Sequence, residues 1–455
     1  MVKDMTVGNP TKLILSFSIP LLIGNVFQQL YNMADTLVVG RFVGVKALAA
    51  VGATGSISFL VLGFIMGLTS GFSVLVAQRF GAKDEDGLRH SVAMSIYLCS
   101  AFTIIITIIA LLSSKPLLML MKTPSDIIEN SNIYISIIYM GCAVSFLYNM
   151  LAGILRALGD SKTPLYFLII SSILNIVLDI LFVVNFHMGV AGAAIATVIS
   201  QLVSGILCYI YIKKRYPILK FQKRDWKFNG DTIKYLLRIG LPMSFQFSIT
   251  AIGIMILQSA INRFGSTVVA AFTAASKVEP LATTPLSTLG VTMATYTGQN
   301  LGAGAYGRIK EGIRKSIIIS LAASLIGGIL IFFFGKYLVN LFLSEPEKEV
   351  IAYGTRYLNT IALYFFPLGI LFIFRNTLQG LGDGLVPLLG GVIELISRSV
   401  VALVFSRIYG YAAICYASPL SWIAAGLWLV ICYRVRAKKF MNMEFVTDDS
   451  SNSNI

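Results

Sequence analysis

The chain of 455 residues is 56% hydrophobic and only 13% charged, and its formal net charge is +15. Soluble domains carry roughly 25% charged residues, so this composition excludes a soluble globular protein and predicts an all-α integral membrane protein. The five cysteines are scattered through apolar segments, without the spacing of a disulfide framework or a zinc site, and we interpret them as inert buried thiols.

Apolar segments long enough to cross a bilayer follow one another along nearly the whole chain. A transmembrane helix needs about 20 apolar residues, and this criterion predicts twelve spans. The first segment lacks a small-residue cleavage site, so we expect a retained helix rather than a cleaved signal. The predicted spans are 13–38, 47–76, 89–112, 133–156, 164–185, 189–212, 235–262, 268–298, 313–334, 353–377, 386–406 and 410–433.

The positions of Lys and Arg predict the orientation. With the N-terminus in the cytoplasm, inside connectors and tails hold about 25 of the 36 basic residues, and outside loops hold about 8. We therefore expect a multi-pass protein of the cell membrane with both termini in the cytoplasm. Membrane topology already accounts for the basic loops, and a folded basic domain is lacking, so we expect no nucleic-acid partner.

The two halves of the chain repeat each other at a nearly constant offset. Each half holds six predicted spans, an even number, so both halves enter the membrane from the same side and form a parallel repeat. The matching positions are Gly159-Asp160 with Gly382-Asp383, Pro164 with Pro387, Gln78 with Gln299, Arg41-Phe42 with Arg263-Phe264, and Pro20 with Pro242.

Transporters with such repeats place a binding site between or within their two halves. We therefore predict twelve transmembrane helices in two pseudo-symmetric six-helix lobes around a central cavity. The expected division is an N-terminal lobe at 1–212, a basic cytoplasmic connector at 213–234, a C-terminal lobe at 235–434 and a polar cytoplasmic tail at 435–455.

Acidic side chains inside the predicted spans mark the candidate site. An ionisable group in a membrane helix costs roughly 2.5–3.5 kcal/mol on insertion scales, so it is by default a functional candidate. Asn175 and Asp179 share one face of the fifth span because they are four residues apart. At about 1.5 Å per residue, Asp179 lies roughly 22 Å from the inner surface, and Asp35 in the first span lies at or beyond that depth.

Three further polar residues are expected near this pair. Thr197 lies roughly 12 Å below the outer surface, Asn175 just below the acids, and Asn149 deeper. Two acids in a medium of low dielectric constant cannot easily both stay ionised, so one takes a proton or both hold a cation. The predicted cation-coupling residues are Asp35, Asn149, Asn175, Asp179 and Thr197, of which Asp35, Asn175, Asp179 and Thr197 are candidate Na⁺ ligands. The alternative is a hydrogen-bonded cluster that only fixes helix packing.

The C-terminal half carries different chemistry, since Ala402 aligns with the acid of the fifth span. Glu394 and Arg398 have the spacing of an internal ion pair, which we interpret as structural. Glu279 is either a partner for Lys277 or a ligand for a cationic substrate. Aromatic residues of this half form either an adaptable wall for flat cations or packing against lipid. The candidate lining of a substrate cavity is Lys277, Glu279, Tyr364, Phe365, Glu394 and Arg398.

Taken together, these residues resemble the multidrug and toxic compound extrusion (MATE) family over essentially the whole chain. The resemblance rests on the acid near the end of the first span, Asn-x-x-x-Asp in the fifth, Leu-Gly-Asp…Pro after the fourth and tenth, and Gln-Asn-Leu-Gly-Ala at 299–303. It implies a cavity between two lobes and export of organic cations or drugs in exchange for H⁺ or Na⁺, with no cofactor besides the coupling ion. The residues of the first half resemble the DinF-like branch. The NorM-like branch has acids in spans 7 and 10 that this chain lacks, which puts a Na⁺ site in the second half in doubt.

Three other classes of protein are less compatible with the sequence. A flippase of lipid-linked saccharides would need unpaired basic residues in its cavity, whereas Lys277, Arg356 and Arg398 each have an acid within reach or lie at a span end. A membrane enzyme would need a nucleophile or metal constellation, which does not occur. A channel is disfavoured because acids in one half do not form a ring. Nothing in the chain demands a partner subunit, so we expect a monomer.

Overall fold

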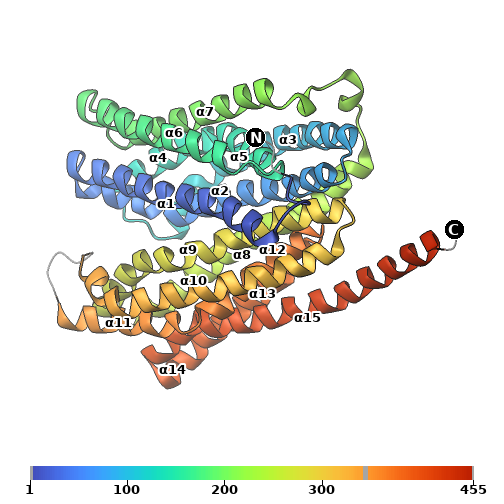
Figure 1. The fold of residues 1–455 in the computed structure, drawn as a ribbon. Coiled ribbons are helices and arrows are strands. Elements are labelled where there is room, and N and C mark those ends of the chain that lie inside the picture. Colours follow the sequence, from blue (N-terminus) through green and yellow to red (C-terminus); the bar gives the residue numbers. More distant parts are fainter. Residues whose placement is uncertain (1–3, 342–346, 453–455) are drawn as a thin grey trace. The chain divides into compact units, whose positions relative to one another are not determined.

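The computed structural model describes residues 4–341 and 347–452, and within these ranges it consists of helices and short connectors, without a strand (Figure 1). The first half contains α1 (Pro10–Phe42), α2 (Val45–Gly81), α3 (Glu85–Leu120), α4 (Ile128–Met140), α5 (Cys142–Ala157), α6 (Lys162–Asp179), η1 (Ile180–Asn185), α7 (Gly189–Arg215), η2 (Pro217–Leu219) and η3 (Lys223–Trp226). The second half contains α8 (Gly230–Ile261), η4 (Asn262–Phe264), α9 (Ser266–Gly302), α10 (Tyr306–Leu341), α11 (Lys348–Ala362), α12 (Phe365–Gly380), α13 (Leu385–Val400), η5 (Val401–Phe405), α14 (Ser406–Tyr409) and α15 (Tyr411–Asn452).

The helices reproduce the predicted membrane spans. Within the described residues, nine helices are long and apolar enough to cross a membrane, and two bent pairs, α4 with α5 and α11 with α12, raise that number to 11. The predicted span 268–298 falls within α9, which has 37 residues but is not among the helices that reach this hydropathy. Its many small and hydroxyl-bearing residues explain the lower average.

The internal repeat appears in the backbone as well as in the sequence. The α4–α5 pair bends by 48° and the α11–α12 pair by 53°. A π-helical turn follows α6 and another follows α13, as η1 and η5. Gly159 and Gly382 adopt φ values of 81° and 84°, in the left-handed region that glycine enters without steric cost. The two halves therefore share one architecture.

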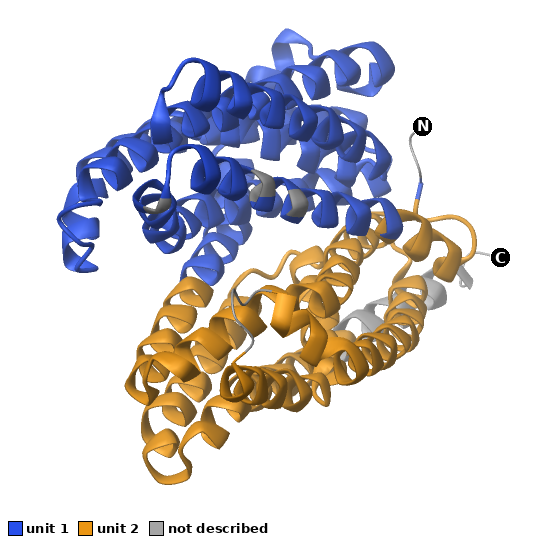
Figure 2. Ribbon diagram, turned by 90° about the vertical axis from the view of Figure 1, so that its left-hand side faces the viewer, with its two compact units in different colours: residues 1–4, 19–248 blue, residues 5–18, 249–455 orange. Residues whose placement is uncertain are grey.

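Contacts divide the chain into two compact units (Figure 2). Unit 1 comprises residues 1–4 and 19–248, and unit 2 comprises residues 5–18 and 249–455. Two helices thus contribute to both units: α1 passes from unit 2 into unit 1 after Ser18, and α8 passes from unit 1 into unit 2 after Ser248. The lobe boundaries predicted from the repeat stay a prediction.

Each repeated glutamine bonds to the first turns of the first helix of the other half or to the segment just before that helix. In unit 2, the Met5 backbone N–H donates to Oε1 of Gln299 at 2.8 Å, and Met5 is completely buried. In unit 1, the Tyr235 hydroxyl donates to Oε1 of Gln78 at 3.0 Å. These bonds fasten the beginnings of α1 and α8 within units that are built mainly from the opposite halves.

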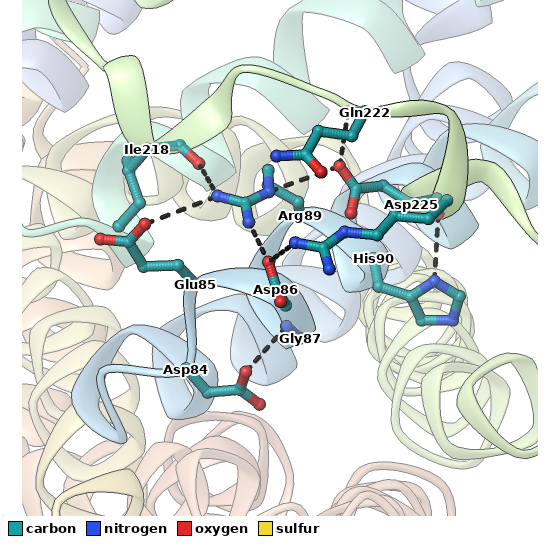
Figure 3. A network of polar contacts seen from close by, with 10 residues as sticks. Asp84, Glu85, Asp86, Gly87, Arg89, His90, Ile218, Gln222 and Asp225 are labelled. Atoms are coloured by element: carbon teal, nitrogen blue, oxygen red, sulfur yellow. Dashed lines mark hydrogen bonds and ion pairs between the residues drawn. The ribbon is translucent and has the colours of Figure 1, made fainter.

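The connector between α7 and α8 is fastened to the beginning of α3 (Figure 3). Arg89 of α3 donates to the Ile218 carbonyl at 3.3 Å, and its Nε lies 3.4 Å from Oδ2 of Asp225. Asp86 pairs with Arg89 and also accepts from Arg224 at 2.9 Å. This network fixes the basic connector to unit 1.

Capping chemistry accounts for the repeated Gly-Asp motifs. Oδ1 of Asp160 accepts from the backbone N–H of Thr163 at 3.0 Å, at the start of α6. Oδ1 of Asp383 accepts from the N–H of Val386 at 3.2 Å, at the start of α13.

One end of unit 1 is formed by the connectors 79–89, 156–163 and 213–234. These connectors contain several Lys and Arg residues, and we call this end of unit 1 the basic end.

Candidate functional site

Unit 1 contains a polar cavity of about 230 Å³. Its lining residues come from α1, α2, α4, α5, α6 and α7, and most of them carry hydroxyl, amide or carboxyl groups. A polar cavity of this size is expected to hold water, since unbonded polar groups away from water are costly. The cavity, which we call the chamber, therefore places many hydrogen-bonding groups inside a bundle whose outer surface is apolar.

Asp35 brings a carboxyl group into this chamber. The residue lies on α1, lines the cavity and is only 8% exposed. Within the described part of the chain, no hydrogen-bond partner reaches its Oδ1 atom. Burial without such a partner disfavours a permanent negative charge, so this group is suited to take up a proton or a cation.

Asp179 lies within electrostatic range of Asp35, although it is not among the described residues that line the cavity. This residue ends α6, is completely buried, and its charge interacts with that of Asp35. Tyr31 and Tyr134, which both line the cavity, lie within electrostatic range of both carboxyl groups. The structure thus brings together the two acids that lie 144 positions apart in the sequence.

The predicted polar neighbours lie at different distances from the cavity. Thr197 lines it, and its Oγ1 accepts from the Tyr31 hydroxyl at 3.3 Å. Asn175 is completely buried on α6, one turn before Asp179. Asn149 is not among the described residues that line the cavity, and its amide donates to the Ser145 carbonyl at 2.8 Å. Asn149 therefore supports the wall of the chamber behind Ser145.

Several lining residues escaped the sequence analysis. Tyr31 precedes Asp35 by one turn, and Gln201 follows Thr197 by one turn, so each shares a helix face with a predicted residue. This one-turn spacing is the only feature of the sequence that could have indicated Tyr31 and Gln201 as lining residues. A tyrosine or glutamine in a span also packs against other helices, and only the tertiary structure shows that these side chains face the cavity.

Unit 2 holds a buried ion triad. Glu394 accepts from Arg398 at 2.6 Å and from Arg375 at 2.7 Å, and all three residues are less than a tenth exposed. The predicted ion pair of Glu394 with Arg398 is confirmed. Arg375 is a third member that the sequence analysis missed, because it lies on the preceding helix, α12.

The structure gives Glu279 a partner other than Lys277. The Tyr357 hydroxyl donates to Oε2 of Glu279 at 3.1 Å, and the positive charge of Arg398 acts on this carboxyl group. Lys277 is exposed. The interpretation of Glu279 as the partner of Lys277 is therefore not supported by these contacts.

The two aromatic candidates belong to the packing of unit 2. Tyr364 lies at the break between α11 and α12, and its ring packs edge-on against Tyr416 with centroids 6.1 Å apart. Phe365 is completely buried. We therefore assign Phe365 to the hydrophobic core and not to a wall that adapts to substrates.

The fold and the chamber together define a class of protein. Repeated halves of membrane-spanning helices, with buried acids beside a polar cavity, are the construction of a secondary transporter and not of an enzyme. A family model described as MatE matches residues 20–181 and 242–405, one block in each half. The chain belongs to this family, so it is a MATE-family efflux transporter, and the resemblance noted in the sequence is confirmed.

Individual relatives agree with this assignment. The "Probable multidrug resistance protein YpnP" of Bacillus subtilis (strain 168) is 32% identical over 406 residues, which cover 89% of this chain and 90% of the relative. The "Probable multidrug resistance protein NorM" of Thermotoga maritima is 27% identical over 383 residues, covering 83% and 82%. A solved structure called "Outward-facing conformation of a multidrug resistance MATE family transporter of the MOP superfamily" has a TM-score of 0.89 at 26% identity, covering 97% and 98%.

Proposed function

We propose that the protein is a secondary active antiporter that exports organic cations across the cell membrane in exchange for H⁺ or Na⁺. The observation that carries this proposal is that Asp35 lines the chamber of unit 1 and that the buried Asp179 lies within electrostatic range of it. The relatives named as multidrug resistance proteins support drug-like cargo. We further propose that the protein works as a monomer with both termini in the cytoplasm, as the basic connectors indicate.

The chemistry of the acid pair supplies the coupling. Two neighbouring carboxyl groups in a buried site repel each other, so binding of H⁺ or Na⁺ relieves that repulsion. Asn175 and Thr197 add neutral oxygen donors of the kind that hard cations accept. Once a small ion neutralises the pair, a cationic substrate loses its electrostatic attraction to the site. Mutual exclusion of the two ligands then couples their movements.

Large substrates require the chamber to change shape. Ligand pockets for drug-sized molecules measure roughly 300–1,000 Å³, whereas this chamber measures about 230 Å³. Pro20 lies inside α1 and interrupts its backbone hydrogen bonding, which makes this position a natural place to bend. A bend there would move the helix that carries Asp35.

The geometry does not favour the alternative of a flippase for lipid-linked saccharides. Such a protein would hold a pyrophosphate group with unpaired basic side chains. The two buried arginines of unit 2, Arg375 and Arg398, both donate to Glu394. Their charges are engaged within the protein, so this cluster lacks the free cations that an anionic lipid carrier would require.

Transport by purified protein in liposomes tests the proposal, with pH and Na⁺ gradients imposed separately and ethidium as the cationic probe. We expect Asp35→Asn and Asp179→Asn to lower gradient-driven export about tenfold or more. Asp126→Asn is the matched control, because this exposed acid lies in the connector between α3 and α4 and pairs with Lys46 at the start of α2. Undiminished export by both cavity variants at normal protein levels would refute the scheme.

A further inference from the structure

The chamber of unit 1 has two chemically different ends. Tyr31, Asp35 and Thr197 form one end, where the carboxyl group lies. The lining continues along one face of α7 to Gln201 and Ser204. At about 1.5 Å per residue, these side chains lie roughly 6 and 10 Å from Thr197 towards the basic end. That second end contains hydroxyl and amide groups but no charged lining residue among those described.

The neutral end contains an amide and a hydroxyl group that are available to a ligand. Ser145 of α5 donates to Oε1 of Gln201 at 2.9 Å, and among the described residues the two N–H donors of this amide remain available. Ser200 is 3% exposed, lines the chamber, and its Oγ has no hydrogen-bond partner among the described residues. A buried hydroxyl without a partner costs roughly 1–3 kcal/mol, so a ligand or water is expected to bond there.

From this arrangement we infer that the chamber selects compact organic cations that carry a neutral hydrogen-bonding group at the end of the molecule away from the positive charge. The inference rests on the proposed function, in which Asp35 attracts the cation, and it adds a class of substrate. Gln201, with Ser200 beside it in the sequence, recognises the neutral group. Tyr31 and Tyr134 also line the chamber and supply aromatic rings that can attract a cation.

The volume of the chamber supports a compact ligand. About 230 Å³ is below the usual range for drug-sized pockets, so in the shape described here the chamber excludes a large polycyclic cation. An amide or carbonyl group at the neutral end would replace water without leaving Gln201 unbonded, whereas an alkyl group would leave its amide without a partner. Discrimination therefore comes from the cost of unsatisfied polar groups, and charge alone does not provide it.

Equilibrium binding to the purified protein tests this inference without any ion gradient. The probes are N-acetylputrescine, which has an ammonium group and an acetamide group separated by four carbons, and hexylamine, which has similar length and no amide. We expect the wild type to prefer N-acetylputrescine about tenfold, since one satisfied hydrogen bond contributes about 1.4 kcal/mol. Gln201→Met keeps the side-chain volume and should abolish this preference while hexylamine still binds.

Three further measurements complete the test. Ser145→Ala should keep the preference, because the Gln201 amide stays in place and gains a free acceptor. Gln258→Met is the matched control, since this glutamine on α8 bonds to Asn262 in unit 2. Asp35→Asn should weaken both probes alike. Equal affinities of the wild type for the two amines, or an unchanged preference in Gln201→Met, would overturn the inference and identify the Ser145–Gln201 bond as packing between α5 and α7.

The outcome is separable from that of the antiport proposal. A preference that Gln201→Met erases would stand even if no pH or Na⁺ gradient drove export. Conversely, ion-coupled export of ethidium with equal binding of the two amines would leave the antiporter intact and refute only the assigned selectivity.

Discussion

In unit 1, two buried acids lie within electrostatic range of each other, and one of them, Asp35, lines a cavity, whereas in unit 2 the buried acid Glu394 lies between Arg375 and Arg398. Both arrangements occur on repeated helices, since α13 is the counterpart of α6 and carries the triad acid. The two units therefore share a backbone architecture and differ in their buried acids. The acids of unit 1 can accept an external ion, whereas the acid of unit 2 is already paired with two arginines.

The contrast between the two sites indicates which unit can respond to an ion gradient. A carboxylate held by two guanidinium groups has its compensating charge within the protein, and breaking such a buried pair is costly. Carboxyl groups that repel each other gain from any cation that arrives. We therefore expect unit 1 to exchange ions during the transport cycle, and we expect the triad of unit 2 to stay intact.

The largest expected effect comes from breaking the triad. Glu394→Gln would leave Arg375 and Arg398 as buried charges without their counterion, which costs about 3–5 kcal/mol of folding free energy. We expect a clear fall in the temperature of thermal unfolding in detergent, monitored by intrinsic fluorescence. The triple variant Arg375→Met, Glu394→Leu and Arg398→Met removes all three charges and should recover most of that loss. Equal stability of Glu394→Gln and the wild type would contradict a structural role for the triad.

A smaller effect is expected at the basic end of unit 1. The Tyr216 hydroxyl donates to Oδ2 of Asp160 at 2.8 Å, and burial, reinforced by this bond, raises the pKa of Tyr216. Tyr216→Phe removes a hydrogen bond to a carboxylate, for which we expect a loss of about 1.5 kcal/mol in stability, seen as a lower unfolding temperature. The counterpart in unit 2 is the 2.7 Å pair of Asp383 with Arg436. Because Arg436 is more exposed, Arg436→Met should cost less, and the reverse order would contradict this comparison.

The sequence predicted much of the difference between the two units. Hydropathy predicted the spans, the repeat predicted the matching halves, and the cost of burying acids singled out Asp35 and Asp179. The spacing of Glu394 and Arg398 predicted their pair because both lie on one helix face. These successes share a cause, since each rests on a periodicity or an energy that a short segment already contains.

What the sequence could not predict depends on contacts between distant segments. Arg375 joins the triad from another helix, and no local spacing relates it to Glu394. Gln201 and Tyr31 face the chamber because of how α7 and α1 are rotated within the bundle, which their own periodicity does not determine. The passage of α1 and of α8 from one unit into the other likewise depends on tertiary packing, to which residues such as Met5 contribute.

A still smaller effect on stability is expected for the coupling acid. Asp35→Asn keeps the side-chain shape and removes a group that is costly to ionise where it lies, so the stability should change by no more than about 1 kcal/mol, or should rise. Export should nevertheless be lost. The measurement pairs the unfolding temperature with liposome transport for the same preparation. A fall in stability as large as that of Glu394→Gln would mean that Asp35 is a packing residue, and the contrast between the two units would fail.

The smallest effect is expected at Lys277. This side chain is exposed, and Glu279 bonds to Tyr357 instead, so Lys277→Ala should change the stability by no more than about 0.5 kcal/mol and leave export unchanged. Tyr357→Phe is the comparison variant. It removes the hydroxyl that donates to Glu279, so it should lower the stability more than Lys277→Ala does. Unfolding temperatures of the two variants, measured side by side, decide between the partners. A larger loss of stability in Lys277→Ala than in Tyr357→Phe would support the Lys277–Glu279 pair that the sequence suggested.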